Sequence, residues 1–576
     1  MKRWFKYIKP YLSSFILGPL GMIVEVIGEM FMPLLLARLI NSANEGTLTV
    51  PKSLGIAGML IVIVLLMMSG GVAGAYFGAK ASVNFAADLR RDMYTKVQQY
   101  SFANIDKFSA SSLVTRMTND ITQIQNFVNM LLRMALRSPG MLIGGIVMAI
   151  YLKPSLSVIL AVTMPIMLIV ILALIAIGFP RFEKLQKKVD KLNSTVRENV
   201  TNVRVVKSFV REDYEINKFQ TDNKDLKDSG MKAVKILIWA SPVMNIFMYI
   251  TVIAVIWSGN KIVLDGGMPV GDLSAFITYT TQILSSLMMV SMLFMFSSRA
   301  LASGKRICEV LDEKIDINDT NSSAEHKITD GNIEFRNVSF RYYKTSEEAV
   351  LENVNLKINA GSTVGIIGST GCGKTTLISM IPRLYDVDEG EVLIDGVNVK
   401  DYSLVNLRDG IGMVLQKNLL FSGDIGYNLR WGNADATDAE MIRAAEHSAA
   451  HKFVSTFNDG YMTVLDKGGM NLSGGQKQRL CIARALLKKP KILILDDSTS
   501  AVDTATEKQI RDAFATDLPD CTKIIIAQRI SSVMDADSII VMNDGKITGI
   551  GTHDWLLENN EEYSEIYYSQ MDKKEA

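Results

Sequence analysis

The sequence predicts an α-helical membrane bundle of six transmembrane helices with long cytoplasmic extensions, followed by an α/β domain. Four stretches contain no Asp, Glu, Lys or Arg, namely residues 54–79, 154–180, 236–260 and 273–298. Each is long enough to cross a hydrocarbon core of ~30 Å, for which a helix needs about 20 residues. Beyond residue 330, short β-branched runs alternate with helical stretches, which is typical of a soluble α/β domain.

Composition excludes several classes of protein. Hydrophobic residues make up 48% of the 576 residues, which is too many for a disordered chain. The 61 Lys and Arg residues nearly balance the 60 Asp and Glu residues, so no basic excess indicates a nucleic-acid partner. Four cysteines are too few for a disulfide framework.

The first span is expected at about residues 11–40, after a basic, aromatic segment (1–10) that suits an interfacial helix. It carries Glu25 and Glu29, which are four residues apart and therefore share one helix face near mid-membrane. Acids at this depth are candidate contacts for a cationic amphiphile. The alternative is a structural hydrogen bond or ion pair with another helix.

The third span is expected at about residues 127–152 and carries Arg133 and Arg137. These two arginines lie near its inner end, where snorkelling or pairing with another helix is the expected role. With the four charge-free stretches and the first span, this gives six transmembrane helices.

Loop charges set the expected orientation. Residues 181–235 contain 14 Lys and Arg, whereas the short connections near residues 41–53, 153–154 and 261–272 carry one lysine each. The N-terminus and the C-terminal domain are therefore expected in the cytoplasm. The two long inner connections read as helices that leave the membrane, turn near residues 102–108 and 210–219, and return. Simple hairpins without a coupling role are the alternative.

Three segments follow from this pattern. Residues 1–311 form the transmembrane domain, and the polar, turn-rich residues 312–330 suit a linker. Residues 331–576 form the α/β domain, with strands expected at residues 363–367, 491–495 and 523–527.

The strongest motif is GSTGCGKT at residues 368–375, which fits G-x-x-x-x-G-K-[ST] between a strand and a helix. Glycines let backbone N–H groups cradle phosphates at a helix N-terminus. Lys374 would reach the β- and γ-phosphates, and the Thr375 hydroxyl would bind Mg²⁺. The residues expected to bind nucleotide here are Gly368, Ser369, Thr370, Gly371, Cys372, Gly373, Lys374, Thr375 and Thr376.

A second apolar strand, KILILDD, ends in two acids, and Asp496 would hold Mg²⁺ directly or through water. A third motif, LSGGQ at residues 472–476, precedes a helical stretch. With these three motifs the chain resembles the ATP-binding cassette family. Six spans joined to one C-terminal cassette resemble an exporter half-transporter over the whole length.

The resemblance implies further roles. Tyr342 matches the aromatic residue that stacks on adenine, and residues 500–503 (SAVD) match the D-loop. Gln416 matches the Q-loop glutamine, which is expected to act in catalysis and to bind Mg²⁺. It also implies a head-to-tail dimer with a second half-transporter, in which each ATP lies between one phosphate loop and the other chain's signature. The signature residues that would serve the partner's ATP are Leu472, Ser473, Gly474, Gly475 and Gln476.

Two positions depart from the family pattern. The catalytic glutamate is replaced by Asp497, and the switch histidine by Gln528. A carboxylate set back by one methylene is misplaced for catalysis, and a glutamine cannot become cationic. This combination resembles the degenerate-site subunit of bacterial heterodimeric multidrug exporters. A homodimer that tolerates both substitutions is the alternative.

The expected function is ATP-driven export of amphipathic or lipid-like compounds, drugs included, through the cell membrane by alternating access. The expected partners are a second half-transporter, the lipid bilayer and an amphipathic small molecule, with ATP and Mg²⁺ as cofactors and no nucleic acid. The alternatives are a homodimeric exporter of lipids or peptides and, in a different class, an ATP-gated channel or regulatory subunit.

Overall fold

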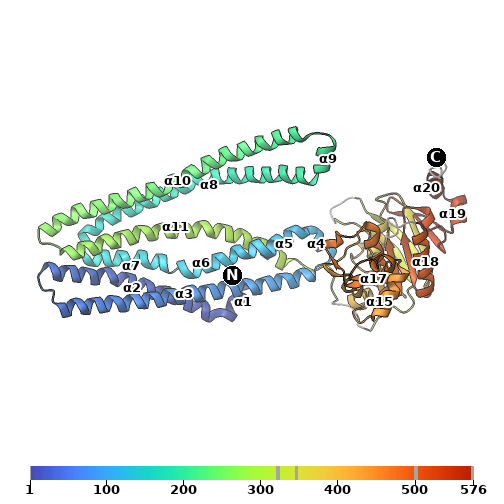
Figure 1. The fold of residues 1–576 in the computed structure, drawn as a ribbon, viewed down its shortest axis with the longest axis horizontal. Helices are drawn as coiled ribbons and strands as arrows, with labels where there is room; N and C mark the ends of the chain where they lie inside the picture. The colour runs from blue at the N-terminus through green and yellow to red at the C-terminus, as the bar shows by residue number, and fades with distance from the viewer. Residues whose placement is uncertain (1, 320–322, 324, 344–347, 498–503, 572–576) are drawn as a thin grey trace. The chain divides into compact units, whose positions relative to one another are not determined.

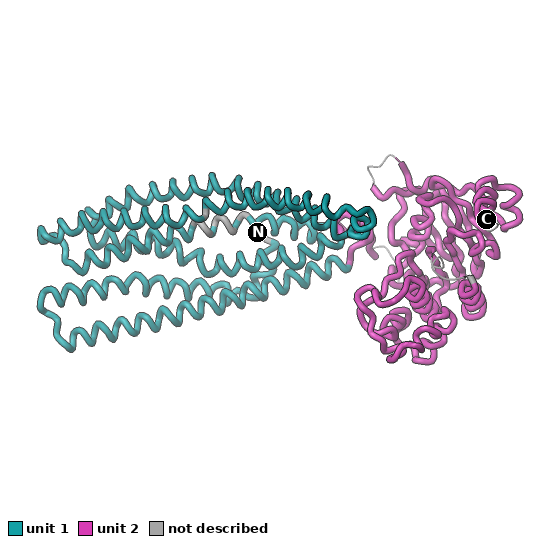
Figure 2. Tube along the Cα trace, turned by 45° about the horizontal axis from the view of Figure 1, so that its top comes forward, with its two compact units in different colours: residues 1–98, 110–313 teal, residues 99–109, 314–576 magenta. Residues whose placement is uncertain are grey.

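The structure, a computed structural model, describes residues 2–319, 323, 325–343, 348–497 and 504–571. The chain divides into two compact units, coloured separately in Figure 2. The membrane unit comprises residues 1–98 and 110–313, and the cassette unit comprises residues 99–109 and 314–576. The short segment 99–109 therefore belongs with the cassette, although it lies between two helices of the membrane unit in sequence.

Long helices make up the membrane unit (Figure 1). Six candidate membrane spans occur among the described residues, which confirms the predicted number. The main helices are α2 (Leu12–Asn44), α3 (Val50–Gln98), α6 (Ile121–Met134), α7 (Arg137–Leu152), α8 (Pro154–Thr201), α10 (Glu212–Leu264) and α11 (Val270–Asp312). Shorter helices are α1 (Lys2–Ile8), η1 (Lys9–Tyr11), α5 (Ala110–Thr115), η2 (Arg116–Asp120) and α9 (Val203–Ser208).

Small residues bring α2 and α3 close together. A Cβ atom added to Gly21 would lie 2.6 Å from the carbonyl oxygen of Gly70, and one added to Gly74 would lie 3.1 Å from that of Gly18. Membrane helices pack through such small residues because burial of apolar surface gains little in lipid. A larger side chain at Gly21 would therefore push the two helices apart.

Three predicted details of the membrane unit are refined. The third span is not one helix, since α6 ends at Met134 and α7 begins at Arg137. The second inner turn lies at residues 202–211, earlier than the predicted 210–219, because the acidic residues at the start of α10 favour a helix N-terminus there. The N-terminal segment is helical, but Trp4 stacks on Phe85 of α3 and Tyr7 is buried against the same ring.

The cassette contains two main sheets. A six-stranded sheet has the order β12-β11-β3-β10-β9-β6, with parallel pairs except at β11–β12, and a four-stranded antiparallel sheet has the order β2-β1-β4-β5. The predicted strands are confirmed as β3 (Thr363–Gly368), β9 (Ile492–Asp496) and β10 (Thr522–Ile526). The other strands of these two sheets are β1 (Ile333–Phe340), β2 (Leu351–Ile358), β4 (Glu389–Ile394), β5 (Val397–Asn398), β6 (Ile411–Val414), β11 (Ser538–Asn543) and β12 (Lys546–Gly551).

Helices complete the cassette around two hydrophobic clusters. Leu377, which follows the phosphate loop, packs in one cluster, and Leu472, which begins the signature, packs in the other. Different parts of the cassette core therefore position the two motifs. Helices of the cassette include α4 (Phe102–Phe108), α12 (Lys374–Met380), α17 (Gly474–Leu487), α18 (Thr504–Asp517) and α20 (Glu561–Met571).

Candidate nucleotide site

The phosphate loop connects the buried strand β3 to helix α12. Gly368 has φ +154°, and a Cβ atom there would lie 2.1 Å from the carbonyl oxygen of Met542. Gly373 has φ +97°, and its Cβ atom would lie 2.9 Å from the carbonyl oxygen of Val350. The loop follows this path because both glycines lack a side chain, and the path ends at the first residue of α12.

Lys374 and Thr375 lie at the start of α12, as the motif predicts. The Lys374 Nζ atom donates to the carbonyl oxygens of Gly368 at 2.8 Å and Ser369 at 2.7 Å, so the ammonium lies over the loop. The Thr375 hydroxyl donates to both carboxylate oxygens of Asp496 at 3.1 Å. This arrangement joins the phosphate loop to the end of β9.

The Thr375 hydroxyl and the Asp496 carboxylate suit Mg²⁺, which prefers oxygen ligands and retains several waters. Bound there with ATP, Mg²⁺ would neutralise charge on the β- and γ-phosphates. Burial raises the pKa of the Asp496 carboxyl, and the hydrogen bond from Thr375 acts in the opposite direction. Among the described residues, no group of three or more His, Cys, Asp or Glu side chains is arranged to hold a metal ion.

Tyr342 presents a partly exposed ring, with 42% of its surface accessible. Its edge-on neighbours are Phe340, at 5.0 Å between ring centroids, and Tyr385, at 5.2 Å. Its hydroxyl lies 2.9 Å from the hydroxyl of Thr376 on α12. The ring is therefore fixed beside the phosphate loop with one accessible surface, which suits stacking on a nucleobase.

Asp497 and Gln528 come together at the ends of neighbouring strands. Because β9 and β10 are parallel with Asp496 opposite Ile526, the residues that follow them meet at one sheet edge. Gln528 Nε2 donates to Asp497 Oδ2 at 2.8 Å. Burial raises the pKa of Asp497, while hydrogen bonds from Gln416 and Gln528 act in the opposite direction. The two unusual residues thus contact each other directly.

The signature motif begins helix α17. Ser473 is the N-cap: its hydroxyl accepts from the backbone N–H of Gln476 at 3.3 Å, and Gln476 Oε1 accepts from the Ser473 N–H at 2.9 Å. This capping box fixes the first turn, whose N–H groups and dipole favour an anion. A Cβ atom added to Gly474 would meet no atom within 4 Å, so the surface beside it is open. The predicted D-loop residues 500–503 lie outside the described residues.

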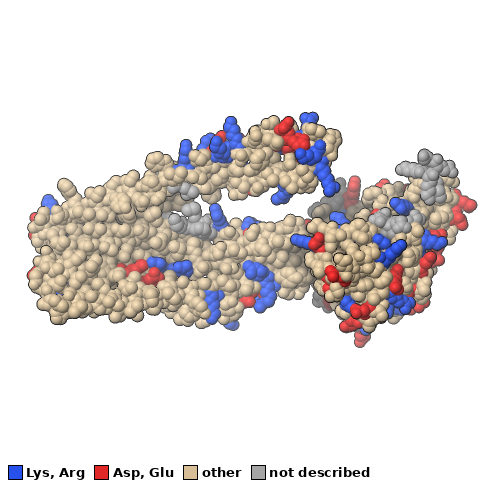
Figure 3. All heavy atoms as spheres, in the orientation of Figure 1, with Lys and Arg blue, Asp and Glu red and all other residues tan. Residues whose placement is uncertain are grey.

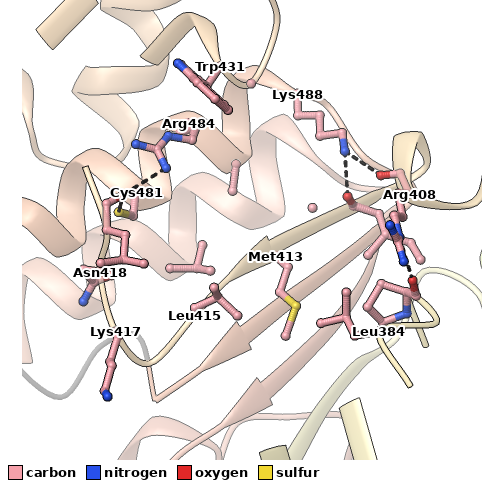
Figure 4. A pocket seen from close by; sticks show the side chains of 17 residues that line it. Leu384, Arg408, Met413, Leu415, Lys417, Asn418, Trp431, Cys481, Arg484 and Lys488 are labelled. Carbon is pink, nitrogen blue, oxygen red and sulfur yellow. Dashed lines mark hydrogen bonds between the residues drawn. The ribbon is translucent and has the colours of Figure 1, made fainter. Parts of the chain in front are cut away.

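A cavity of 340 Å³ lies in the cassette and is lined by the two sequence neighbours of Gln416 (Figure 4). Residues on either side of that glutamine line it, including Leu415 and Lys417, and its wall includes Trp431 and Arg484. None of the phosphate-loop or signature residues lines this cavity. The nucleotide residues instead lie along the carboxyl edge of the sheet and at the start of α17.

In the membrane unit the predicted acids meet an arginine. Arg137 Nη2 lies 2.8 Å from Glu29 Oε1 and 3.1 Å from Glu25 Oε1, and both acids are 17% exposed. Figure 3 shows a small cluster of acidic and basic residues on a stretch of the membrane unit that is otherwise mostly uncharged. The expectation that the arginines pair with another helix holds for Arg137, whereas Arg133 is exposed. The acids and Arg137 form a group with one excess negative charge.

Two residues of the nucleotide site were not anticipated from the sequence. Tyr385 packs on Tyr342 and donates its phenol to Asp106 of α4 at 2.8 Å. Gln570 of α20 accepts from the N–H of Ile530 at 2.9 Å and donates to the carbonyl of Gln528 at 2.8 Å. No local motif marks either residue, because each acts through a partner that is distant in sequence.

Six membrane spans joined to a cassette with a phosphate loop and a capped signature helix define an ATPase coupled to membrane transport. Residues 15–287 match the ABC transporter transmembrane region, and residues 351–500 match the ABC transporter family. An ABC transporter ATP-binding protein of Bacillus subtilis, YfiB, is 37% identical over 576 residues, which cover 100% of this chain and 99% of that protein. The chain therefore belongs to the ABC transporter family, as a half-transporter and a multi-pass membrane protein.

Two other relatives are named for a substrate class. YgaD of Bacillus subtilis, a putative multidrug export ATP-binding/permease protein, is 32% identical, covering 99% of each chain. An ATP-dependent lipid A-core flippase of Syntrophus aciditrophicus is also 32% identical, covering 89% of this chain and 85% of the relative. The solved structure of a bacterial Atm1-family ABC exporter with ATP bound superposes with a TM-score of 0.78 at 24% identity, covering 98% of each chain. It shows that the fold is that of an ABC exporter, a class that acts as dimers.

Proposed function

We propose that this half-transporter exports amphipathic or lipid-like compounds as one half of a heterodimer. In this pair its own phosphate loop builds a weakly hydrolytic ATP site, and its signature completes the partner's catalytic site. The observation that carries the proposal is the direct Gln528–Asp497 contact beside an intact phosphate loop and an intact signature. A homodimer would need two such altered sites to hydrolyse ATP.

The residues divide into two sets under this proposal. Tyr342, Lys374 and Thr375 bind ATP and Mg²⁺ at the weak site, where Asp497 and Gln528 give little hydrolysis. Ser473 and Gly474 position the γ-phosphate of the ATP held by the partner. Groups that stabilise a transition state electrostatically typically contribute about 10²–10³-fold each. The two sets therefore predict opposite results when they are changed separately.

The test is steady-state ATPase activity of the tagged chain purified together with the half-transporter that accompanies it. Gly474→Asp should reduce turnover by about 100-fold or more, whereas Asp497→Asn should change it by less than about twofold because a poorly placed carboxylate is removed. A robust ATPase from this chain alone would contradict the heterodimer. Loss of activity in Asp497→Asn with retention in Gly474→Asp would reverse the assignment of the two sites.

The substrate class is supported by the names of two relatives and by the charged group in the membrane unit. Glu25, Glu29 and Arg137 carry one excess negative charge between them. A cationic amphiphile is the ligand that such a group would favour. Stimulation of ATPase activity by cationic amphiphiles, and its loss in Glu25→Gln/Glu29→Gln, is the expected result. Stimulation by neutral lipids alone would favour a lipid exporter.

The proposed location is the cell membrane, with the N-terminus and the cassette in the cytoplasm. Cysteines placed at Asn44 and Gly266 should react with an impermeant thiol reagent in intact cells. A cysteine placed at Asp435 in the cassette should react only after permeabilisation. External labelling at Asp435 would contradict the orientation.

A further inference from the structure

We infer that Gln528 acts as a lock on Asp497, in the sense that its side-chain amide hydrogen-bonds the carboxylate and keeps it from the attacking water. We infer also that Gln570 is the positioning residue that maintains this hydrogen bond. The inference rests on the proposed function, since it explains how the chain's own ATP site is kept weakly hydrolytic. A shorter carboxylate by itself would only lie farther from the attacking water. The contacts around Asp497 indicate instead that the carboxylate is engaged by protein groups.

Asp497 is held by its backbone as well as its side chain. Its φ of +47° lies in the left-handed region, which is uncommon for a residue other than glycine. Its N–H donates to the carbonyl oxygen of Ile526 at 3.0 Å, which ties it to the end of β10. The carboxylate therefore leaves the backbone in a direction fixed by both strands.

Two side-chain amides then occupy the carboxylate. Gln528 donates to Oδ2 at 2.8 Å, and Gln416 donates a second hydrogen bond. To act on water, the carboxylate must accept a hydrogen bond from it along a free lone-pair direction, and amides fill part of that capacity. A histidine at position 528 would meet the carboxylate with one ring nitrogen instead of an NH₂ group. Asp497 and Gln528 therefore act together, because the amide of one engages the carboxylate of the other. They are more than two independent replacements of catalytic residues.

Gln528 is exposed, so its hydrogen bond to Asp497 needs a further constraint to stay formed. A hydrogen bond between accessible groups contributes little by itself, because water competes for both partners. Gln570 provides the missing constraint: its side-chain amide bonds the backbone of Gln528 and of Ile530 at the same time. Fixing this backbone lowers the entropy that Gln528 loses on reaching Asp497.

The experiment measures ATP hydrolysis at the phosphate loop of this chain, in membranes that contain the complete transporter. Vanadate traps 8-azido-ADP only at a site that has cleaved ATP, and photolabelling marks the chain whose phosphate loop holds it. Labelling with 8-azido-[γ-³²P]ATP without vanadate shows in the same samples that each variant still binds nucleotide. The variants are Asp497→Glu, Asp497→Glu/Gln528→Leu and Asp497→Glu/Gln528→His, with the unaltered chain as reference.

A lock predicts that Asp497→Glu traps little, because Gln528 still engages the longer carboxylate. Removing the amide in Asp497→Glu/Gln528→Leu should then raise trapping by about tenfold, which corresponds to ~1.4 kcal/mol. Asp497→Glu/Gln528→His should trap at least as much. Equal trapping in Asp497→Glu and Asp497→Glu/Gln528→Leu, at any level, would overturn the inference. Strong trapping by the unaltered chain would instead contradict the proposed weak site.

Gln570→Met tests the positioning role, because methionine has a similar length without hydrogen-bonding groups. In the Asp497→Glu background it should raise trapping by a few-fold and speed amide hydrogen exchange at Ile530. Gln509→Met, at an exposed glutamine of α18, is the matched control and should change neither. If Gln570→Met speeds exchange at Ile530 but leaves trapping unchanged, Gln570 has only a structural role.

Discussion

Tyr385 donates a hydrogen bond from its phenol to Asp106 at 2.8 Å. This bond joins the segment that follows helix α12 to helix α4. The ring of Phe102, also on α4, lies 6.0 Å from the Tyr385 ring, and Tyr385 packs edge-on against Tyr342. Asn104 donates to the carbonyl oxygen of Lys314 at 3.0 Å. These contacts explain why the inner turn of the chain belongs to the cassette unit.

We expect Tyr385→Phe to loosen α4 on the cassette. The lost hydrogen bond to a carboxylate is worth about 1.5 kcal/mol or more, so amide exchange across residues 102–108 should accelerate about tenfold or more. Asp106→Ala should have the same effect, and the double variant should add little because both changes remove one contact. Tyr343→Phe, at an exposed neighbour, is the control. Full additivity of the two changes would show that the contact is not formed.

Arg137→Met should destabilise the membrane unit. It leaves Glu25 and Glu29 largely buried without a cation, and breaking a buried ion pair costs about 3–5 kcal/mol. Thermal unfolding of the purified protein, followed by size-exclusion chromatography, should shift to lower temperature. Adding Glu25→Gln and Glu29→Gln should restore much of the loss, because the uncompensated charges are removed. Arg133→Met, at an exposed arginine, should change stability little.

Two glycines should respond very differently to alanine. At Gly368 the new Cβ atom would lie 2.1 Å from a backbone oxygen, so Gly368→Ala should distort the phosphate loop and reduce ATP photolabelling of this chain at least tenfold. At Gly474 no atom lies within 4 Å, so Gly474→Ala should leave that labelling unchanged. Equal labelling of both variants would show that the loop does not bind nucleotide as described.

Asp395 should make the start of the cassette sensitive to acid. Burial tends to raise its pKa, but hydrogen bonds from the backbone N–H groups of residues 329–332 outweigh this and hold the pKa below its ordinary value. A carboxyl group whose pKa is lowered in the folded state stabilises that state at pH values above its unfolded pKa of about 3.9. This stabilisation is lost as the pH falls through the folded-state pKa. Amide exchange at residues 329–332, corrected for intrinsic rates, should therefore quicken below about pH 4.

Asp395→Asn separates charge from geometry in this case. It keeps an acceptor oxygen but cannot titrate, so protection at residues 329–332 should be lower at neutral pH and nearly independent of pH. Asp435→Asn, at an exposed aspartate, should behave like the unaltered chain. A pH dependence that persists in Asp395→Asn would assign the acid sensitivity to another group.

Features that depend on local pattern could be predicted from the order of residues alone. Four charge-free stretches and two apolar stretches with a few charges, all of spanning length, predicted six membrane helices, since a polar group in hydrocarbon is costly wherever the chain goes next. The phosphate loop and the signature could be recognised because the residues of each motif lie within a few positions of one another in the chain. The identities of Asp497 and Gln528 were likewise readable from the chain.

Contacts between groups that are distant in sequence depend on how the helices and strands pack. Arg137 could be given a partner only once α7 was placed against α2, because a charge pattern along one helix does not name the helix beside it. The contact of Gln528 with Asp497 depends on the parallel register of β9 and β10, and its clamp by Gln570 depends on where α20 packs. Tyr385 and Asp106 are 279 residues apart and share no motif. Such contacts arise from packing and strand order, which local propensity does not encode.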